Sequence, residues 1–397
     1  MTDPPVVLLG GTVNALWVAR SMARAGIAVH GVGEGVSPFL LRHSRYVSSV
    51  LAVRDPSTAH EEWLEWLSSG PAGAVLLPCG DLGVEFVALH REDLLRLGYA
   101  PTEADDEISL AMLDKSQTYA LAEKIGIEVP RTLTVRSADD IADAALDFSF
   151  PCALKPVHSH RASRKVAAKA FVVHGARELE EQWRRIASLG IDAIVTEIVP
   201  GPEASYCSYY SYIDEHGSPL VHFTKRKPRQ YPRGFGWGCF HETAWEPEAA
   251  EIGLRFLQGV GLRGLGFVEF KRDERDGRLK LIECNPRLSA ATELVRLAGV
   301  DLARLAYERA AGRSAPRFGP FTCGLREWYP LDDTRTCLSL WRGGELSLRA
   351  WATSLAPPLH LPIFDVRDPR PSAAKAVDRA RRATTRAARR LRPGNER

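Results

Sequence analysis

The feature that most constrains the fold is the order of the first three predicted elements. Val6–Leu9 is an apolar run that ends at two glycines, and Thr12–Arg24 then carries apolar residues at helical spacing. A glycine closes this helix, and Ile27–Val32 is predicted to be a second strand. Because strand–helix–strand order requires a parallel sheet, we predict an N-terminal doubly wound parallel-sheet lobe of the α/β class.

Ligands of such lobes lie beyond the carboxyl ends of the strands. Gly10 and Gly11 lie at one such end, but the residues after them do not complete the G-x-G-x-x-G fingerprint. A nicotinamide cofactor is therefore not expected. A further predicted strand, Ala74–Leu77, leads into Asp81, which either holds the amine of a substrate or caps a turn.

From about Leu110 the pattern changes to a mixed α+β region that extends to residue 311. Helices are predicted over 114–125, 176–188 and 248–259, and strands over 132–135, 152–155, 170–173, 193–199, 205–212, 220–223, 265–271 and 279–284. Asp276-Gly277 is a strong turn signal between the last two strands, so we predict that they form a hairpin.

Two glutamates lie inside the apolar strands of this hairpin. The pairing brings Glu269 near Glu283, and alternation puts Asn285 on the same face as Glu283. For either strand alone, an ordinary hairpin with an exposed glutamate is the alternative, because glutamates are usually exposed. Three oxygen donors on a rigid hairpin, with room left for phosphates, instead predict a Mg²⁺ site.

Lys155 ends an apolar strand and is followed by a polar loop, residues 158–165. A buried lysine is costly unless an anion neutralises it, and the loop adds five basic or histidine side chains that could close over phosphates. A zinc site at His158 and His160 is the alternative, but two histidines without a third ligand do not make a tetrahedral site.

These features occur in the order found in a known superfamily. The series comprises Lys115, Gly126–Pro130, Lys155, Thr196–Glu203, Glu269 and Glu283–Arg287. Over roughly residues 1–310 the chain resembles the ATP-grasp superfamily, and most of all its predicted carboxylate-amine ligase branch, which includes D-aspartate ligases. The resemblance implies a Rossmann-like domain at 1–109, followed at 110–311 by an ATP-grasp domain of two α+β lobes.

The resemblance also implies how ATP is bound. Lys115 and Lys155 would contact the phosphates. Thr196, Glu197 and Val199 would lie at the adenine, with Glu203 at the ribose hydroxyls. Thr196 stands where relatives often have Glu or Gln, and the 158–165 loop lacks the glycines that many relatives wrap around phosphates.

Catalytic roles follow from the same resemblance. Glu269, Glu283 and Asn285 would ligate Mg²⁺, and Arg287 would stabilise charge on the transferred phosphoryl group or the substrate carboxylate. The basic stretch 225–232 would contribute Lys227 and Arg229 near the γ-phosphate or acyl phosphate, with a solvated basic loop as the alternative. Three glycines between 234 and 238 predict a flexible loop close to the ligand.

The remaining chain is predicted to form a C-terminal appendage at 312–370 and a basic helical tail at 371–397. Alanines recur in the tail at three- and four-residue steps among arginines, which predicts an amphipathic helix. The tail holds nine basic and two acidic residues, so its +7 leaves −4 for the rest of a chain of net charge +3. A solvated helix is one interpretation, and contact with an acidic partner or membrane surface is the other.

Together with the resemblance, the sequence predicts an enzyme, an ATP-dependent carboxylate-amine ligase. It would form an amide or peptide bond through an acyl phosphate, release ADP and phosphate, and use ATP and Mg²⁺. Its substrates would be a small carboxylate and a small amine, such as amino acids or a short peptide. The alternatives are a kinase of the same fold acting on a hydroxyl, and a non-catalytic ATP-binding protein, against which the complete set of metal ligands argues.

Composition excludes other classes. The acidic body and a tail without aromatic residues argue against nucleic-acid binding. No run approaches the roughly 18 apolar residues of a membrane helix, and the first residues lack the positive flank of a signal peptide. We therefore expect a cytoplasmic protein without a membrane span, and an oligomer is compatible with the sequence. The seven cysteines form no Cys-x-x-Cys pair, so neither disulfides nor structural zinc are expected.

Overall fold

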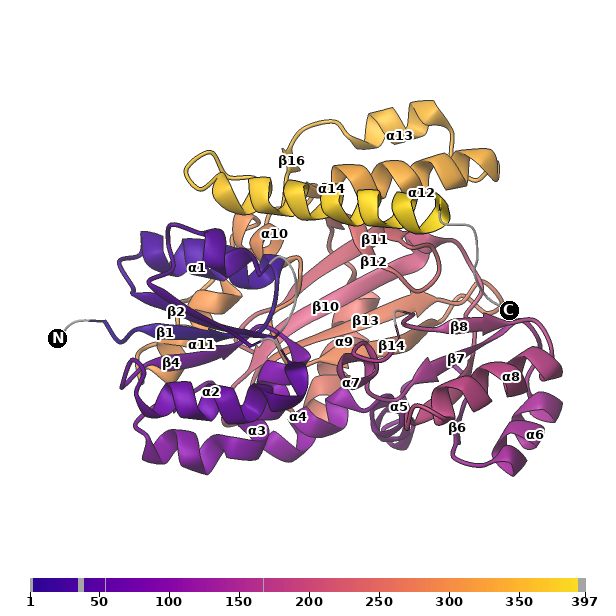
Figure 1. Cartoon of the computed structure of the whole chain (residues 1–397), viewed down its shortest axis with the longest axis horizontal. Coiled ribbons are helices and arrows are strands. Elements are labelled where there is room, and N and C mark those ends of the chain that lie inside the picture. The colour runs from indigo at the N-terminus through magenta and orange to yellow at the C-terminus, as the bar shows by residue number, and fades with distance from the viewer. Residues whose placement is uncertain (1–2, 35–38, 54, 167, 392–397) are drawn as a thin grey trace.

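The structure is a computed structural model that describes residues 3–34, 39–53, 55–166 and 168–391 (Figure 1). Its N-terminal lobe is built on a five-stranded parallel sheet in the order β3-β2-β1-β4-β5. The strands are β1 (Val6–Leu9), β2 (Val29–Glu34), β3 (Ser49–Val53), β4 (Val75–Pro78) and β5 (Ala100–Pro101), and the helices are α1 (Val13–Arg24), α2 (Ala59–Ser68) and α3 (Asp81–Arg96), with the short 3-10 turns η1 (Leu40–His43) and η2 (Pro56–Thr58).

The alternation of side chains along β1 explains why helices cover both faces of this sheet. Val6 and Leu8 pack on the side of α1, whereas Val7 and Leu9 pack against Trp63 of α2 and the helix α3. All four β1 residues are buried. A strand that is apolar on both faces is typical of a parallel sheet between two helical layers, so the predicted doubly wound lobe is confirmed.

A second, four-stranded sheet has the order β6-β9-β7-β8 and antiparallel pairing. Its strands are β6 (Thr132–Val135), β7 (Cys152–Pro156), β8 (Phe171–Val173) and β9 (Ala193–Glu197), and its helices are α6 (Ala138–Asp147) and α8 (Ala176–Ala187). Apolar residues of both helices and of the strands form one core. Helices α4 (Asp106–Leu113) and α5 (Lys115–Lys124) connect the N-terminal lobe to this sheet, and α7 (Ser159–Ala162) follows β7.

The third sheet has seven strands in the order β14-β13-β10-β11-β12-β15-β16. The strands are β10 (Tyr206–Ile213), β11 (Phe223–Tyr231), β12 (Trp237–Thr243), β13 (Gly264–Arg272), β14 (Leu279–Asn285), β15 (Arg326–Trp328) and β16 (Leu359–His360), preceded by η3 (Glu203–Ser205). The helices after β12 are α9 (Pro247–Gly259), α10 (Thr292–Leu297), α11 (Leu302–Ala310), α12 (Pro330–Arg342), α13 (Leu348–Ser354) and α14 (Arg370–Leu391).

Two features of this sheet bear on the predictions. The hairpin of β13 and β14 is confirmed. The strand predicted over 220–223 is wrong, because the strand begins at Phe223 and continues through the basic residues to Tyr231. After Phe223, the buried face of this strand carries Lys225 and Lys227, so the usual apolar alternation is missing over the basic residues.

The C-terminal segment does not fold apart from the rest. Strands β15 and β16 extend the seven-stranded sheet by pairing with β12 and with each other. The described part of the predicted tail is helical, and residues 392–397 lie outside the described residues. Helix α14 runs alongside α12 at the top of Figure 1, where Arg379 of α14 binds Asp332 of α12 at 2.5 and 2.6 Å. Among the residues that the structure describes, no helix combines the length and apolar character needed to span a bilayer.

Candidate active site

A cleft of about 660 Å³ lies between the three sheets. Its walls come from the turns after β1 and β4, the start of α5, β7 and one face of the seven-stranded sheet. Seven basic side chains line it against three carboxylates: Lys115, Lys155, Arg164, Lys169, Lys225, Lys227 and Arg287, against Asp81, Glu269 and Glu283. The volume is typical of a small-molecule site, and the excess of positive charge favours a polyanionic ligand.

The acidic residues of the hairpin meet as predicted. Glu269 and Glu283 are directly paired across β13 and β14, and Asn285 pairs with Phe267 two residues further along. All three predicted metal ligands line the cleft. The Asn285 amide nitrogen is buried without a hydrogen-bond partner, while its oxygen accepts a bond from Arg287 at 3.1 Å. Two carboxylates and an amide are the hard oxygen donors that Mg²⁺ prefers, so the residues present fit this ion.

The Glu283 side chain is an anion although it is buried. Burial alone would raise the pKa of this carboxyl group, but the neighbouring cations Lys169, Lys227, Lys115 and Arg287 lower it below its ordinary value. A carboxylate that stays charged inside a cationic cleft is suited to bind a metal ion together with phosphates.

The two lysines predicted to bind phosphates, Lys115 and Lys155, both line the cleft. Lys115 is the first residue of α5, a helix that is capped by Asp114. The Lys115 ammonium group donates to Ser159 Oγ at 2.6 Å. Lys155 on β7 is 8% exposed, and its Nζ lies 4.9 Å from the ring centroid of Phe235. Burial, together with the charge of Lys115, lowers the pKa of Lys155 to about 8. A bound anion would relieve this unfavourable burial.

On β11 the structure brings Lys227 to the cleft but not Arg229. The Lys227 ammonium binds Glu269 at 2.6 Å. A β-bulge between Arg226 and Arg229 shifts the alternation by one residue, so that Gln230 faces the cleft instead. Arg229 points to the opposite side of the sheet and forms a buried ion pair with Asp333, at 2.5 and 3.2 Å.

Arg287 lies on the cleft wall just after β14. Its guanidinium binds Asp81, the first residue of α3, and also Asn285. Burial would lower the pKa of Arg287, but the Asp81 carboxylate raises it above its ordinary value. The N-terminal lobe thereby orients this arginine toward the predicted metal ligands.

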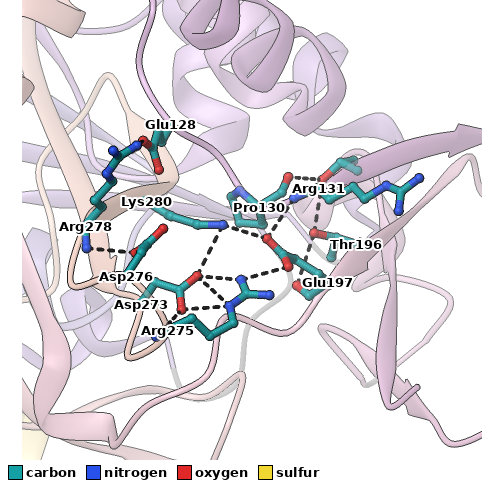
Figure 2. A network of polar contacts seen from close by, with 11 residues as sticks. Glu128, Pro130, Arg131, Thr196, Glu197, Asp273, Arg275, Asp276, Arg278 and Lys280 are labelled. Carbon is teal, nitrogen blue, oxygen red and sulfur yellow. Dashed lines mark hydrogen bonds and ion pairs between the residues drawn. The ribbon is translucent and has the colours of Figure 1, made fainter. Parts of the chain in front are cut away.

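The residues predicted at the adenine lie outside the cleft wall. Thr196 is fully buried and its hydroxyl pairs with that of Thr132 at 3.0 Å. The Glu197 side chain joins the network of ion pairs in Figure 2, where it binds Lys280 at 3.0 Å and Arg275 at 2.9 Å. This side chain is therefore engaged, whereas the adenine contact implied by the resemblance uses the backbone carbonyl of Glu197 and the backbone N–H of Val199. The Val199 carbonyl accepts a bond from Lys271 at 2.7 Å.

Glu203 holds a loop at the same end of the cleft. One of its carboxylate oxygens accepts the backbone N–H of Gly234 at 3.0 Å, and the other accepts that of Gln230 at 3.3 Å. This loop carries Phe235 over Lys155. For the ribose role predicted for Glu203, the carboxylate would have to exchange these two backbone bonds for ribose hydroxyls.

The 158–165 loop is held in place by the N-terminal lobe. Glu85 of α3 binds Arg161, with one nitrogen at 3.0 Å, and lies 3.4 Å from His160 Nε2. Burial would raise the pKa of Glu85, but His160 and Arg161 lower it to about 2. Ion pairs to α3 thus order a loop that lacks glycines. Among the described residues, no group of three or more His, Cys, Asp or Glu side chains is arranged to hold a metal ion. His158 and His160 therefore do not belong to such a group.

Several cleft residues were not predicted as site residues. They include Lys169, Tyr206, Lys225, Gln230 and His241. Lys225 belongs to the basic stretch noted in the sequence, but only the strand register shows that it faces inward.

Comparisons with known proteins agree with this architecture. No protein-family model matches the chain. The chain is 26% identical over 326 residues to D-aspartate ligase of Enterococcus faecium, a match that covers 76% of this chain and 75% of the relative. It is also 26% identical over 230 residues to D-alanine–D-alanine ligase of Pseudomonas putida, covering 56% of this chain and 70% of the relative.

Solved structures resemble the fold at low sequence identity. Biotin carboxylase from Campylobacter jejuni has a TM-score of 0.64 at 15% identity and covers 81% of this chain and 74% of its own. L-amino acid ligase from Bacillus licheniformis has a TM-score of 0.61 at 14% identity, with 79% and 76% covered.

The chain shares its fold with these solved structures. Taken together with the ligases among its relatives, this fold indicates an ATP-grasp carboxylate-amine ligase, an enzyme that forms carbon–nitrogen bonds with ATP and Mg²⁺.

Proposed function

We propose that this chain joins a small carboxylate to a small amine, with amino acids or a short peptide as substrates. The observation that carries the proposal is the pairing of Glu269 and Glu283 inside a cleft in which basic side chains outnumber carboxylates by seven to three. The D-aspartate and D-alanine ligases among the relatives favour amino acid substrates. The cleft combines carboxylates that would bind a metal ion with cations that would bind a polyphosphate, and the N-terminal lobe beside it would hold a substrate.

In the proposed reaction, an oxygen of the substrate carboxylate attacks the γ-phosphorus of ATP, and ADP leaves. The amine then attacks the acyl carbon, loses one proton, and displaces inorganic phosphate. No serine or cysteine nucleophile of the enzyme is needed. The task of the protein is to position the reactants and to neutralise charge as it moves.

Lys115 and Lys155 would neutralise the phosphates, and both lysines have a lowered pKa because of burial. Thr196, Glu197, Val199 and Glu203 remain the proposed contacts of the nucleoside. Phosphate binding would return both ammonium groups to a favourable environment.

Glu269, Glu283 and Asn285 would hold Mg²⁺, which when bound withdraws negative charge from the phosphate oxygens. Lys227, anchored on Glu269, and Arg287, anchored on Asp81, would stabilise the charge on the transferred phosphoryl group. The position of Arg229 on Asp333 favours a structural role for that residue.

The experiment is a panel of D- and L-amino acids, offered singly and in pairs with ATP and Mg²⁺ to the full chain, with ADP and phosphate both measured. We expect steady release of both products only when a carboxylate and an amine substrate are present together. ADP formation without a second substrate, with no free phosphate, would instead indicate a kinase.

A further inference from the structure

Lys225 is a cation of the cleft to which the proposed reaction gives no role. It lies on β11 two residues before Lys227, and is only 3% exposed. Its ammonium nitrogen lies 3.1 Å from Nδ1 of His241, but no carboxylate among the described residues is within ion-pair distance. Lys227, by contrast, is paired with Glu269 at 2.6 Å. Lys225 thus presents an unneutralised positive charge to the cleft.

The two lysines lie at different places along the sheet. Lys227 Nζ is 4.1 Å from the ring centroid of Tyr206, whereas Lys225 Nζ is 5.8 Å from that of Tyr210, four residues further along β10. Tyr210 packs in the same core as the N-terminal β1, and its hydroxyl pairs with Ser289 at 3.1 Å. Lys225 therefore lies on the side of the phosphate-facing cations that is nearer to the N-terminal lobe.

Burial lowers the pKa of Lys225 to about 8, so the lysine is mainly charged at neutral pH, and the groups behind it do not neutralise this charge. Burial keeps the pKa of His241 well below its ordinary value, so the imidazole is neutral and its Nδ1 can accept a bond from the ammonium group. Glu327 lies 3.9 Å from the other side of this ring, fully buried, and neither of its carboxylate oxygens has a hydrogen-bond partner. Burial raises the pKa of Glu327 to about 8, so at neutral pH it is mainly uncharged.

A buried ammonium group without a counter-ion is expensive unless a ligand supplies the anion. We propose that Lys225, oriented by His241, binds a substrate carboxylate that is not the one being activated. This inference rests on the proposed ligase function. The carboxylate is either the second acid group of the donor or the carboxylate of the amine substrate, and both present the same anion to the ammonium group.

The test measures binding by titration calorimetry to the full chain in the presence of ADP and Mg²⁺. In the donor arm, each enantiomer of aspartate is compared with asparagine and isoasparagine, in which one carboxylate or the other is an amide. In the acceptor arm, each enantiomer of alanine is compared with alaninamide. The variants are Lys225→Met, the charge-conserving Lys225→Arg, and the control Arg226→Met, which removes an exposed arginine of the same strand that binds Glu246.

For wild type we expect the acid to bind about 10–100-fold more tightly than an amide in one arm, the effect of one charged hydrogen bond. Lys225→Met should abolish this ratio, whereas Lys225→Arg and Arg226→Met should largely keep it. Lys225→Gln replaces the methionine variant if that protein does not fold. The proposed subsite would be overturned if Lys225→Met kept the wild-type ratio of acid affinity to amide affinity. It would also be overturned if wild type bound acid and amide equally well in both arms.

The binding readout requires no turnover, so the two proposals can fail separately. Charge-dependent discrimination without any amide product would keep the subsite and reject the ligase function. Amide formation with discrimination unchanged in Lys225→Met would reject the subsite alone.

Discussion

Asp81 and Arg287 form an ion pair across the cleft, although 206 residues separate them in the chain. Asp81 begins α3 directly beyond the carboxyl end of β4, and Arg287 follows the strand that carries Glu283 and Asn285. The Asp81 carboxylate of the N-terminal lobe thus contacts the arginine that lies next to the predicted metal ligands. Of the two sequence interpretations of Asp81, neither included this partner.

Asp81→Asn should lower kcat, because the neutral amide holds the Arg287 guanidinium less firmly. We expect a loss of about 10–100-fold, similar to other supporting residues, with little change in the KM for ATP. Steady-state kinetics of this variant beside Arg287→Ala measures the effect. Full activity in Asp81→Asn, with activity lost in Arg287→Ala, would show that the arginine needs no such support.

Glu283→Gln should lower the rate by about 10²–10³ while the protein stays folded, because one charged ligand is lost from the reaction centre. The matched control is Glu274→Gln, which changes an exposed glutamate in the turn of the same hairpin. Initial rates over a range of Mg²⁺ concentrations test this, since the variant should need more Mg²⁺. Near-normal turnover of soluble Glu283→Gln would show that Glu283 is not a ligand of Mg²⁺.

ATP binding should weaken at alkaline pH. Burial lowers the pKa of Lys155 to about 8, so its positive charge is present below that pH and is lost as pH rises through it. The KM for ATP should therefore rise by up to about tenfold per pH unit above pH 8. Lys155→Arg, whose side chain stays charged, should reduce this rise. The same pH profile of KM in wild type and Lys155→Arg would show that Lys155 does not contact the phosphates.

Arg229→Met should act mainly on stability. The substitution leaves Asp333 as a fully buried carboxylate whose remaining partners include Trp328 and Trp351, which donate indole N–H bonds at 2.9 Å. Removal of one partner of a buried ion pair costs about 3–5 kcal/mol, which urea unfolding would measure. Arg226→Met on the exposed face of the strand should change the free energy of unfolding little. A stable Arg229→Met protein without activity would restore a direct catalytic role.

The hairpin could be predicted from the sequence because its information is local. Asp276-Gly277 sets the turn, and alternation puts Glu283 and Asn285 on one face of β14. The direct pairing of Glu269 with Glu283 also depends on a register shift between Glu269 and Phe270, because without it Glu269 would pair with Ile282. The same local rules predict the parallel N-terminal sheet, because apolar runs, a helix and a glycine stop follow one another there, and the structure confirms that sheet.

Strand β11 could not be located in this way. After Phe223 its inward side chains are Lys225 and Lys227, which line the cleft instead of packing in a core, so the apolar alternation that marks a strand is absent there. The bulge that turns Arg229 away was also missed. Pro228 lies at this bulge and was the available signal, because proline inside a sheet is found at edges or bulges.

Long-range pairs such as Asp81 with Arg287, Glu85 with Arg161 and Arg229 with Asp333 depend on how the sheets are arranged in space. No local pattern encodes them. The domain boundaries and the nucleoside contacts remain predictions.

The most direct measurement for the central claim follows oxygen from the substrate to phosphate. The carboxylate substrate, labelled with heavy oxygen, is incubated with the amine, ATP, Mg²⁺ and the full chain, and the phosphate released is analysed by mass spectrometry. If the carboxylate oxygen attacks the γ-phosphorus, one label per turnover passes to inorganic phosphate. Amide formation with unlabelled phosphate would contradict the acyl-phosphate reaction.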